Sequence, residues 1–261
     1  MTTNLISIRI FQILNWIFFG LMILVNYLAN ALPLNDKTTG ALSAQYPNLF
    51  VPAPVTFSIW GVIYLLLLMF CIKQSKTTTN EDTTTVVASI GPRFVVTCLL
   101  NALWILTWHY EHVMFSVLVM LMLLAQLVEL QLKIKALSMS LGKGWRAVLK
   151  SAFGLYLGWI CVATIANITA ALVHYRWSGW GQGEVFWACM MVWIGGVVAI
   201  ISIQRLQNFF IGLSVIWAFM GIIFARFNAV VSHSIIMWNV GIMIFFVLLT
   251  LILRGRFQKK F

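Results

Sequence analysis

The sequence predicts an all-α integral membrane protein, a polytopic bundle of about eight transmembrane helices. Hydrophobic residues make up 62% of the 261 residues and charged residues only 9%, whereas soluble domains carry roughly 25% charged residues. The mean hydropathy is +0.96. A water-soluble core could not bury so many apolar side chains, and lipid can. A helix needs about 20 apolar residues to cross a bilayer, and eight segments approach or reach that length.

The first expected span, 8–31, could be mistaken for a cleaved signal peptide. Its apolar stretch exceeds the usual 7–15 residues and Arg9 is the only basic residue before it, so a retained span is expected. Asn26 and Asn30 are four residues apart on this helix and should face the bundle, where amides find partners. The other expected spans are 54–73, 92–109, 113–132, 148–173, 185–203, 208–225 and 233–254.

Three connections between the expected spans have distinct compositions. Residues 32–53 form a polar, proline-containing connection that is long enough to fold over one end of a bundle as a lid. Residues 74–90 are rich in threonine and are expected to be a solvated linker. Residues 133–150 concentrate lysine and arginine around two glycines and are expected to form a basic loop.

The net charge of +11 is distributed unevenly between the two sides of the expected bundle. With eight spans, 14 of the 17 lysines and arginines fall on the side that holds both termini. Cytoplasmic loops carry such an excess, so the sequence predicts a multi-pass cell-membrane protein with both termini in the cytoplasm. No loop is long enough to form a basic soluble face, and nucleic-acid binding is not expected.

Residues suited to acid–base or metal chemistry are scattered. No two of the six acidic residues share an expected span, the four cysteines lie in apolar segments, and no phosphate-binding or hydrolase motif occurs. We therefore predict no catalytic residue, no metal site and no required cofactor. Glu129 and Lys133 have the spacing of a helical ion pair, the alternative being a functional carboxylate. His109 and His112 are either interface residues or ligands of a metal or porphyrin iron.

The twelve tryptophans are the most unusual feature of the composition. Trp145, Trp177, Trp180 and Trp187 fall where an aromatic belt would anchor the ends of spans. The other eight lie within spans, where indoles serve either helix packing or a cavity for a flat polycyclic ligand.

Three segments resemble a known family in residue type and order. They are PNLFVP (47–52) followed by FSIWGVIY (57–64), then LLNALWILTW (99–108), then YLGWICVATIAN (156–167). They resemble the hallmark segments of the tryptophan-rich sensory protein family, also called TspO, translocator protein or peripheral-type benzodiazepine receptor. That family reads P-x-W-x-P-P and V-W-x-x-L-Y, then L-N-x-x-W, then P-Y-x-x-W-x-x-F-A-T-x-L-N.

The resemblance implies a five-helix core over residues 1–178, followed by three additional helices and a basic tail over 179–261. The chain would then be a divergent, extended member. The family binds tetrapyrroles such as protoporphyrin IX between its helices, and in animals cholesterol and synthetic isoquinolines or benzodiazepines. It is often dimeric, so the implied partners are the bilayer, a hydrophobic ligand and a second copy of the chain.

By position, the resemblance assigns ligand contacts to three helices and a lid to the loop before the second. Leu49 stands where the family has its loop tryptophan, Val51 replaces the first proline of the pair, Leu155 replaces the proline before Tyr156, and Val162 replaces a phenylalanine. The implied lid residues are Pro47 and Pro52. The implied wall residues are Trp60, Tyr64, Asn101, Trp104, Trp108, Tyr156, Trp159, Ala163 and Asn167.

Three functions are compatible with these patterns. The leading expectation is a sensory, regulatory or transport-related receptor that binds a tetrapyrrole-like ligand without enzymatic activity. The second is a small-molecule transporter using polar groups such as Glu129, Asn208, Asn228 and Asn239. The third is an intramembrane enzyme that degrades porphyrins through tryptophan chemistry.

Overall fold

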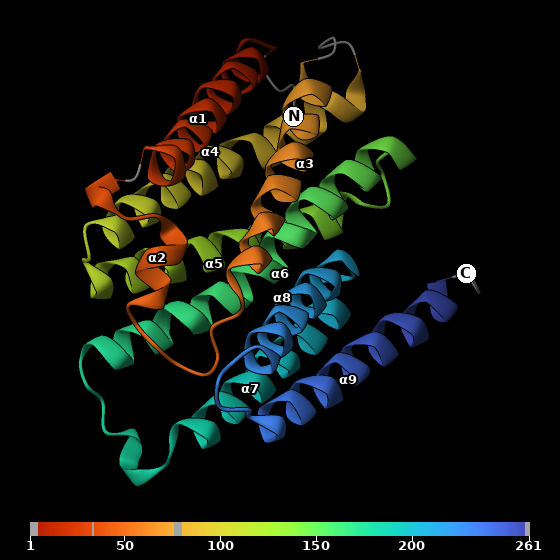
Figure 1. Cartoon of the computed structure of the whole chain (residues 1–261). Coiled ribbons are helices and arrows are strands. Elements are labelled where there is room, and N and C mark those ends of the chain that lie inside the picture. The colour runs from red at the N-terminus through yellow and green to blue at the C-terminus, as the bar shows by residue number, and fades with distance from the viewer. Residues whose placement is uncertain (1–4, 33, 76–79, 259–261) are drawn as a thin grey trace. The chain divides into compact units, whose positions relative to one another are not determined.

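The computed structural model of the chain describes residues 5–32, 34–75 and 80–258, and within these ranges it is helical without any strand (Figure 1). These residues include 8 helices long and apolar enough to cross a membrane, so the predicted polytopic helical class is confirmed. Four residues used in the predictions lie outside the described residues. They are Pro33 of the 32–53 connection and three lysines of the charge count, Lys76, Lys259 and Lys260. The long helices are α1 (Leu5–Ala31), α3 (Ile59–Gln74), α4 (Glu81–His109), α5 (Val113–Leu137), α6 (Lys143–His174), α7 (Glu184–Leu206), α8 (Phe210–Phe227) and α9 (Ser234–Gln258).

Two predicted loops are largely helical, and both predictions were wrong. The supposed linker 74–90 contains the first ten residues of α4, which begins where the Asn80 side chain accepts a hydrogen bond from the Thr83 amide at 3.2 Å. Glu81 and Asp82 follow in the first turn, where acidic groups favour a helix. Buried residues recur at helical spacing through this stretch, namely Thr83, Val86, Val87 and Ile90.

The basic loop predicted at 133–150 shrinks to the short connection 138–142, because α5 and α6 extend into it from both ends. The Asp82 carboxylate accepts a hydrogen bond from the Gly142 amide at 3.0 Å, which ties the start of α4 to this connection. The lysines and arginines therefore sit mainly on helix ends. Lys135, in the last turn of α5, lies where a cation favours the helix dipole.

The chain packs as two compact units, which we describe separately. The first unit comprises residues 1–39 and 60–154, and the second comprises 40–59 and 155–261. The boundary at residue 178 inferred from the family resemblance stays a prediction. Helix α6 contributes its first part to one unit and its second part to the other.

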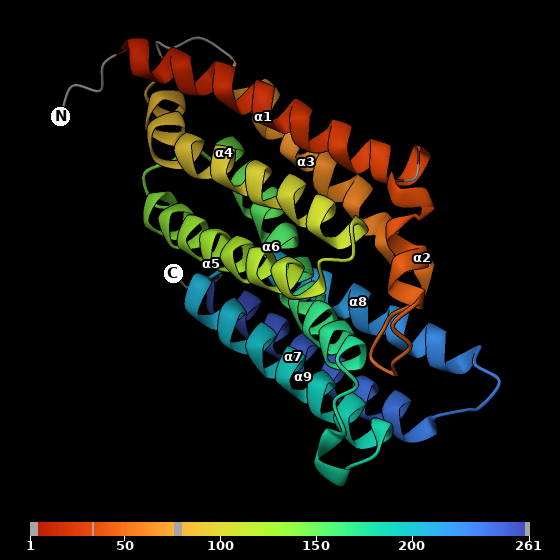
Figure 2. The same cartoon turned by 90° about the vertical axis from the view of Figure 1, so that its left-hand side faces the viewer.

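In the first unit, α4 packs against both α1 and α5 (Figure 2). Phe70 of α3 meets Phe94 and Phe153 edge to face, with ring centroids 5.0 and 5.5 Å apart. Asn26 donates a hydrogen bond to the Asn101 side-chain oxygen at 2.7 Å, as expected for an amide facing the bundle. The same prediction was wrong for Asn30, which is exposed and donates to the Asn26 carbonyl.

Glu129 forms an ion pair, but its partner differs from the predicted one. Its carboxylate lies 2.7 Å from Nη2 and 2.9 Å from Nε of Arg93, across the α4–α5 contact. Arg93 presents a planar fork of donors, which suits a carboxylate better than the ammonium of Lys133. The predicted ion pair between Glu129 and Lys133 was therefore wrong.

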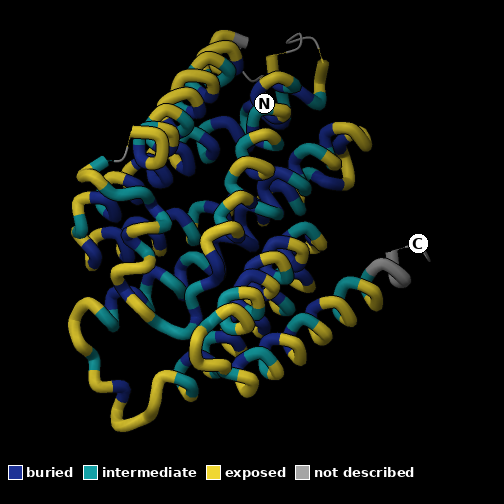
Figure 3. Tube along the Cα trace, in the orientation of Figure 1, coloured by how far each residue is buried: buried dark blue, intermediate teal, exposed yellow. Residues whose placement is uncertain are grey.

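In the second unit, α7, α8 and α9 pack against one another, and α6 lies close to α8. The Ser214 hydroxyl donates to the Leu155 carbonyl at 2.6 Å, and a side chain at Gly158 would collide with the Ile211 carbonyl. Small residues at such crossings let transmembrane helices approach closely. Many residues of α1 and α9 are exposed (Figure 3). Only 22% of the residues in the most apolar stretch of each are buried, against 61% for α6, which suits lipid contact.

Replacing Gly158 with alanine should weaken the α6–α8 crossing. The new methyl group would overlap a backbone carbonyl, which cannot move without shifting α8, and overpacking costs about 1–3 kcal/mol. We expect a lower melting temperature in detergent. The matched control is Gly241→Ala in α9, where no atom lies within 4 Å and alanine favours the helix. Equal melting temperatures for the two variants would contradict the described crossing.

Candidate ligand-binding site

The predicted wall residues of the first unit form two aromatic stacks and a buried amide. Trp60 and Tyr64 stack one turn apart on α3, with ring centroids 5.4 Å apart, and both are half-buried. Trp104 and Trp108 stack on α4 at 6.3 Å with nearly parallel rings. Asn101 is fully buried and bonded to α1. Within their own unit, the four aromatic residues therefore stack in pairs and Asn101 is hydrogen-bonded to Asn26.

The four remaining wall residues belong to the second unit and follow one face of α6. Tyr156, Trp159, Ala163 and Asn167 are spaced three to four residues apart, and all except the half-buried Ala163 are buried. Trp159 packs edge to face against Phe57, with ring centroids 5.6 Å apart. Phe57 belongs to the proline-containing segment after the first span, so this segment and one predicted wall residue do meet.

That segment is fastened to α8. Its short helix η2 (Pro54–Ser58) packs on α8, where the Ala53 amide donates to the Gly221 carbonyl at 3.0 Å. The Trp217 indole donates to the Thr56 carbonyl at 2.8 Å. Any side chain at Gly221 would collide with Thr56, so glycine is required for this approach. The predicted lid is therefore anchored by one of the last three helices.

The preceding turn is organised by Asn48. Its side-chain oxygen accepts hydrogen bonds from the amides of Phe50 and Val51, both at 3.1 Å, and its amide group donates to the Tyr46 carbonyl at 2.9 Å. This is the local pattern by which asparagine stabilises a turn. It fixes the turn between exposed Pro47 and buried Pro52.

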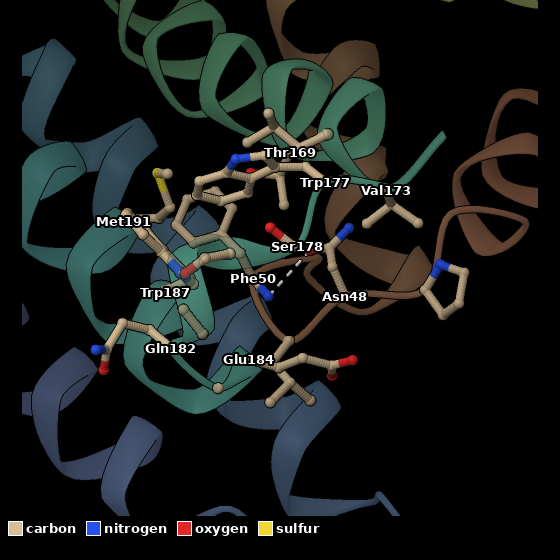
Figure 4. Close-up of a pocket in the computed structure, with 16 residues that line it drawn as sticks. Asn48, Phe50, Thr169, Val173, Trp177, Ser178, Gln182, Glu184, Trp187 and Met191 are labelled. Carbon is tan, nitrogen blue, oxygen red and sulfur yellow. Dashed lines mark hydrogen bonds between the residues drawn. The ribbon is translucent and has the colours of Figure 1, made fainter. Parts of the chain in front are cut away.

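A cavity of about 350 Å³ lies beside this turn (Figure 4). Its volume is within the range of small-molecule sites, and aromatic side chains with a few polar groups line it, as is typical of such sites. Three segments of the second unit supply the lining, namely residues 47–50, the end of α6 with the following connection, and the first two turns of α7. The lining residues are Pro47, Asn48, Leu49, Phe50, Thr169, Leu172, Val173, Trp177, Ser178, Gly179, Gln182, Gly183, Glu184, Trp187, Ala188 and Met191.

Two indoles form the aromatic wall of this cavity. Trp177 and Trp187 are in edge contact with centroids 4.7 Å apart, and Figure 4 shows them together on one side of the cavity. The Trp187 indole donates to the Gly179 carbonyl at 2.9 Å, which fixes its ring. Gly179 and Gly181 have φ of 66° and 77°, values that glycine adopts freely, and they allow the chain to turn back toward α7.

The polar groups of the lining are few and mostly neutral. Glu184 is the only charged residue among the lining residues, and its exposed carboxylate has no hydrogen-bond or ion-pair partner in the described part of the chain. Asn48 and Gln182 present amides. The site can therefore stack a flat apolar ligand on indole faces and orient it by amides, with any acidic groups of that ligand directed away from Glu184.

The main residues of this cavity are not among those predicted from the sequence. Trp177 and Trp187 were assigned to a lipid-facing belt, and Asn48 and Glu184 were not singled out. A usable signal exists in the sequence WSGWG (177–181), because two glycines beside tryptophans indicate a tight turn that can bring indoles together. Leu49, which replaces the family's loop tryptophan, does line the cavity, whose indoles come instead from the end of α6 and from α7.

Other residues considered for chemistry have local structural partners. The ring nitrogens of His109 lie 2.9 Å from the Ile105 carbonyl and 3.4 Å from the Thr39 hydroxyl. Asn208 accepts from the Phe210 amide, Asn228 donates to the Phe224 carbonyl, and Asn239 accepts from the Trp193 indole. These contacts give the amides proposed for a transport pathway a role in holding helices and helix ends.

Fold and site together define a polytopic helical membrane protein with a cavity lined by aromatic residues at the end of α6 and the start of α7. The sequence matches the family model described as TSPO-like protein over residues 12–253. The chain therefore belongs to the TSPO-like protein family. The match includes α7, α8 and most of α9, so the family relationship extends past residue 178, the end of the core that the motifs implied. A search of curated proteins and a search of solved structures found no match.

Removing the Asn48 side chain should loosen the turn beside the cavity. Asn48→Ala leaves the amides of Phe50 and Val51 without their acceptor, and each lost bond costs about 1 kcal/mol. We expect amide hydrogen exchange at residues 49–51 to accelerate by roughly tenfold or more. Asn48→Asp, which keeps the acceptor oxygens, is the control. Unchanged exchange in Asn48→Ala would show that this side chain does not hold the turn.

Proposed function

We propose that this TSPO-like protein binds a flat, hydrophobic ligand of the tetrapyrrole type in a sensory, regulatory or transport role. The observation that carries the proposal is the cavity of about 350 Å³ walled by Trp177 and Trp187 and bordered by the 47–50 turn. Indole faces stack well on flat conjugated rings. We propose binding rather than catalysis, since the family is generally of a binding or transport type.

The cavity supports partial rather than complete enclosure of a macrocycle. Binding sites bury 70–90% of drug-sized ligands in roughly 300–1,000 Å³, and this cavity is at the lower end of that range. One edge of a tetrapyrrole would insert between the indoles and Phe50. Its acidic substituents would stay on the solvent side, away from the Glu184 carboxylate.

The wall inferred from the family motifs is kept as a second, competing location for the ligand. It comprises Trp60, Tyr64, Asn101, Trp104 and Trp108 of the first unit and Tyr156, Trp159, Ala163 and Asn167 of the second. These residues are packed within their units, so a ligand there would have to displace existing side-chain contacts. The cavity in Figure 4 requires no such rearrangement, and for that reason we favour it.

We further propose that the protein resides in the cell membrane as a homodimer with both termini in the cytoplasm. The distribution of basic residues supports this orientation, because 14 of the 17 lysines and arginines would then be on the cytoplasmic side. In that orientation the 47–50 turn and the start of α7 lie outside, and the ligand would enter from the external face.

The proposal is tested by titrating the purified protein with protoporphyrin IX and following tryptophan fluorescence. We expect saturable quenching, and Trp177→Ala should weaken the affinity by about tenfold, since loss of one stacking face costs on the order of 1.4 kcal/mol. The matched control is Trp238→Ala, which removes an indole on α9 that is 74% exposed and outside the cavity lining.

Two further variants separate the competing locations. If the ligand occupies the cavity beside Trp177, Trp60→Phe and Asn101→Ala should leave the affinity unchanged. If it occupies the wall inferred from the motifs, these two variants should weaken binding and Trp177→Ala should not. Non-saturable quenching in the wild type would contradict both locations and the proposed function with them.

A further inference from the structure

Arg226 lies in a second hollow of the same unit, at the end of α8. This hollow has a volume of about 400 Å³ and is bordered by residues 40–44, by the proline-containing segment 51–57 and by the last turn of α8. Apart from Arg226, its lining is neutral, and it includes Pro52, Phe57 and Phe224. A guanidinium group is thus presented to an otherwise largely apolar surface.

Arg226 has neither an ion-pair nor a hydrogen-bond partner among the residues that the structure describes, and its Nε is buried without an acceptor. Several other basic side chains have partners within the chain. Lys37 pairs with Glu111 at 2.5 Å, and Arg93 pairs with Glu129. Arg254, whose Nε is also buried without an acceptor, donates from Nη1 to the Ile203 carbonyl at 2.7 Å. A buried guanidinium nitrogen without an acceptor is costly unless an anion or water meets it, so Arg226, at the end of α8, is arranged for an anionic partner from outside the chain.

A third hollow continues along α8 from the same place. It has a volume of about 450 Å³, shares Phe224 with the Arg226 hollow, and is lined by apolar side chains together with Thr56. Its α8 residues include Trp217, Met220 and Phe227, which recur at helical spacing on one face. From Trp217 to Phe227 the helix rises roughly 15 Å, about half the hydrocarbon thickness of a bilayer. An apolar groove of that length, parallel to a membrane helix, fits an acyl chain.

We propose that an acidic phospholipid binds here, with its phosphate at Arg226 and one acyl chain along the groove on α8. Among the described residues that line the two hollows, Arg226 carries the only charge. A phosphate can accept paired hydrogen bonds from a guanidinium group. No carboxylate in these linings would meet the cationic part of a zwitterionic headgroup, so net negative lipids are preferred. The site is distinct from the cavity of Figure 4 and does not depend on the proposed function.

The test is native mass spectrometry of the detergent-purified protein with an equal mixture of phosphatidylglycerol and phosphatidylcholine that carry the same acyl chains. We expect one tightly retained lipid, with phosphatidylglycerol favoured by about tenfold, because the choline cation of phosphatidylcholine would lie close to the Arg226 guanidinium with no carboxylate to pair it. Arg226→Gln should reduce this preference to near unity, and Arg226→Lys should retain part of it. Arg176→Gln, an exposed arginine at the end of α6 outside both linings, should leave it unchanged.

Two further experiments distinguish a bound phospholipid from a free anion. Met220→Trp should fill the groove and reduce retention of both lipids, while Met190→Trp on α7, outside the groove lining, should not. Inorganic phosphate at millimolar concentration should fail to displace the lipid, whereas displacement would indicate a free-phosphate site and overturn the lipid assignment. A folded Arg226→Gln protein that keeps the tenfold preference would also overturn it. If Arg226→Gln does not fold, Arg226→Lys and Met220→Trp decide. Wild-type lipid preference in Arg226→Lys together with wild-type lipid retention in Met220→Trp overturns the proposal.

The lipid proposal and the tetrapyrrole proposal are tested independently, because each variant is expected to affect only one of the two ligands. Arg226→Gln should leave protoporphyrin quenching unchanged, and Trp177→Ala should leave the lipid preference unchanged. Loss of lipid preference together with intact quenching in Arg226→Gln therefore identifies the lipid site alone.

Discussion

The attachment of the proline-containing segment to α8 is the constraint on which the candidate sites depend. Ala53 and Thr56 are bonded to Gly221 and Trp217, and the absence of a side chain at Gly221 lets the two backbones meet. Backbone groups near the hydrocarbon region must be bonded within the protein, and this contact satisfies some of those that a proline-containing segment cannot satisfy by itself. The three hollows described above all border residues 47–57, so the shape of each depends on this segment being held in place.

The hollows beside this segment carry opposite charges, which favour two different kinds of ligand. The cavity that contains Trp177 has one carboxylate, Glu184, and suits a flat apolar molecule whose acidic groups point outward. The hollow that contains Arg226 has the opposite charge and continues into an apolar groove.

Sequence reasoning was sufficient for features with a local pattern. Hydropathy identified all eight spans, and the position of Asn26 on its helix predicted an amide facing the bundle. It failed where the decisive partner is remote, since the Trp217–Thr56 bond joins residues 161 positions apart. The same reason explains the partner of Glu129, because i, i+4 spacing reveals Lys133 and cannot reveal Arg93 on another helix. The nine wall residues came from motif resemblance, and the cavity in Figure 4 uses none of them.

Hydrogen exchange at residues 51–57 tests the attachment to α8 most directly. In the wild type we predict a slowly exchanging Ala53 amide, because it donates to the Gly221 carbonyl. Gly221→Leu should accelerate exchange throughout the segment by at least about tenfold, while peptides from α4 stay protected and Gly241→Leu has no such effect. Fast exchange of Ala53 in the wild type, or equal exchange in the two glycine variants, would contradict the account that α8 holds this segment and shapes the sites beside it.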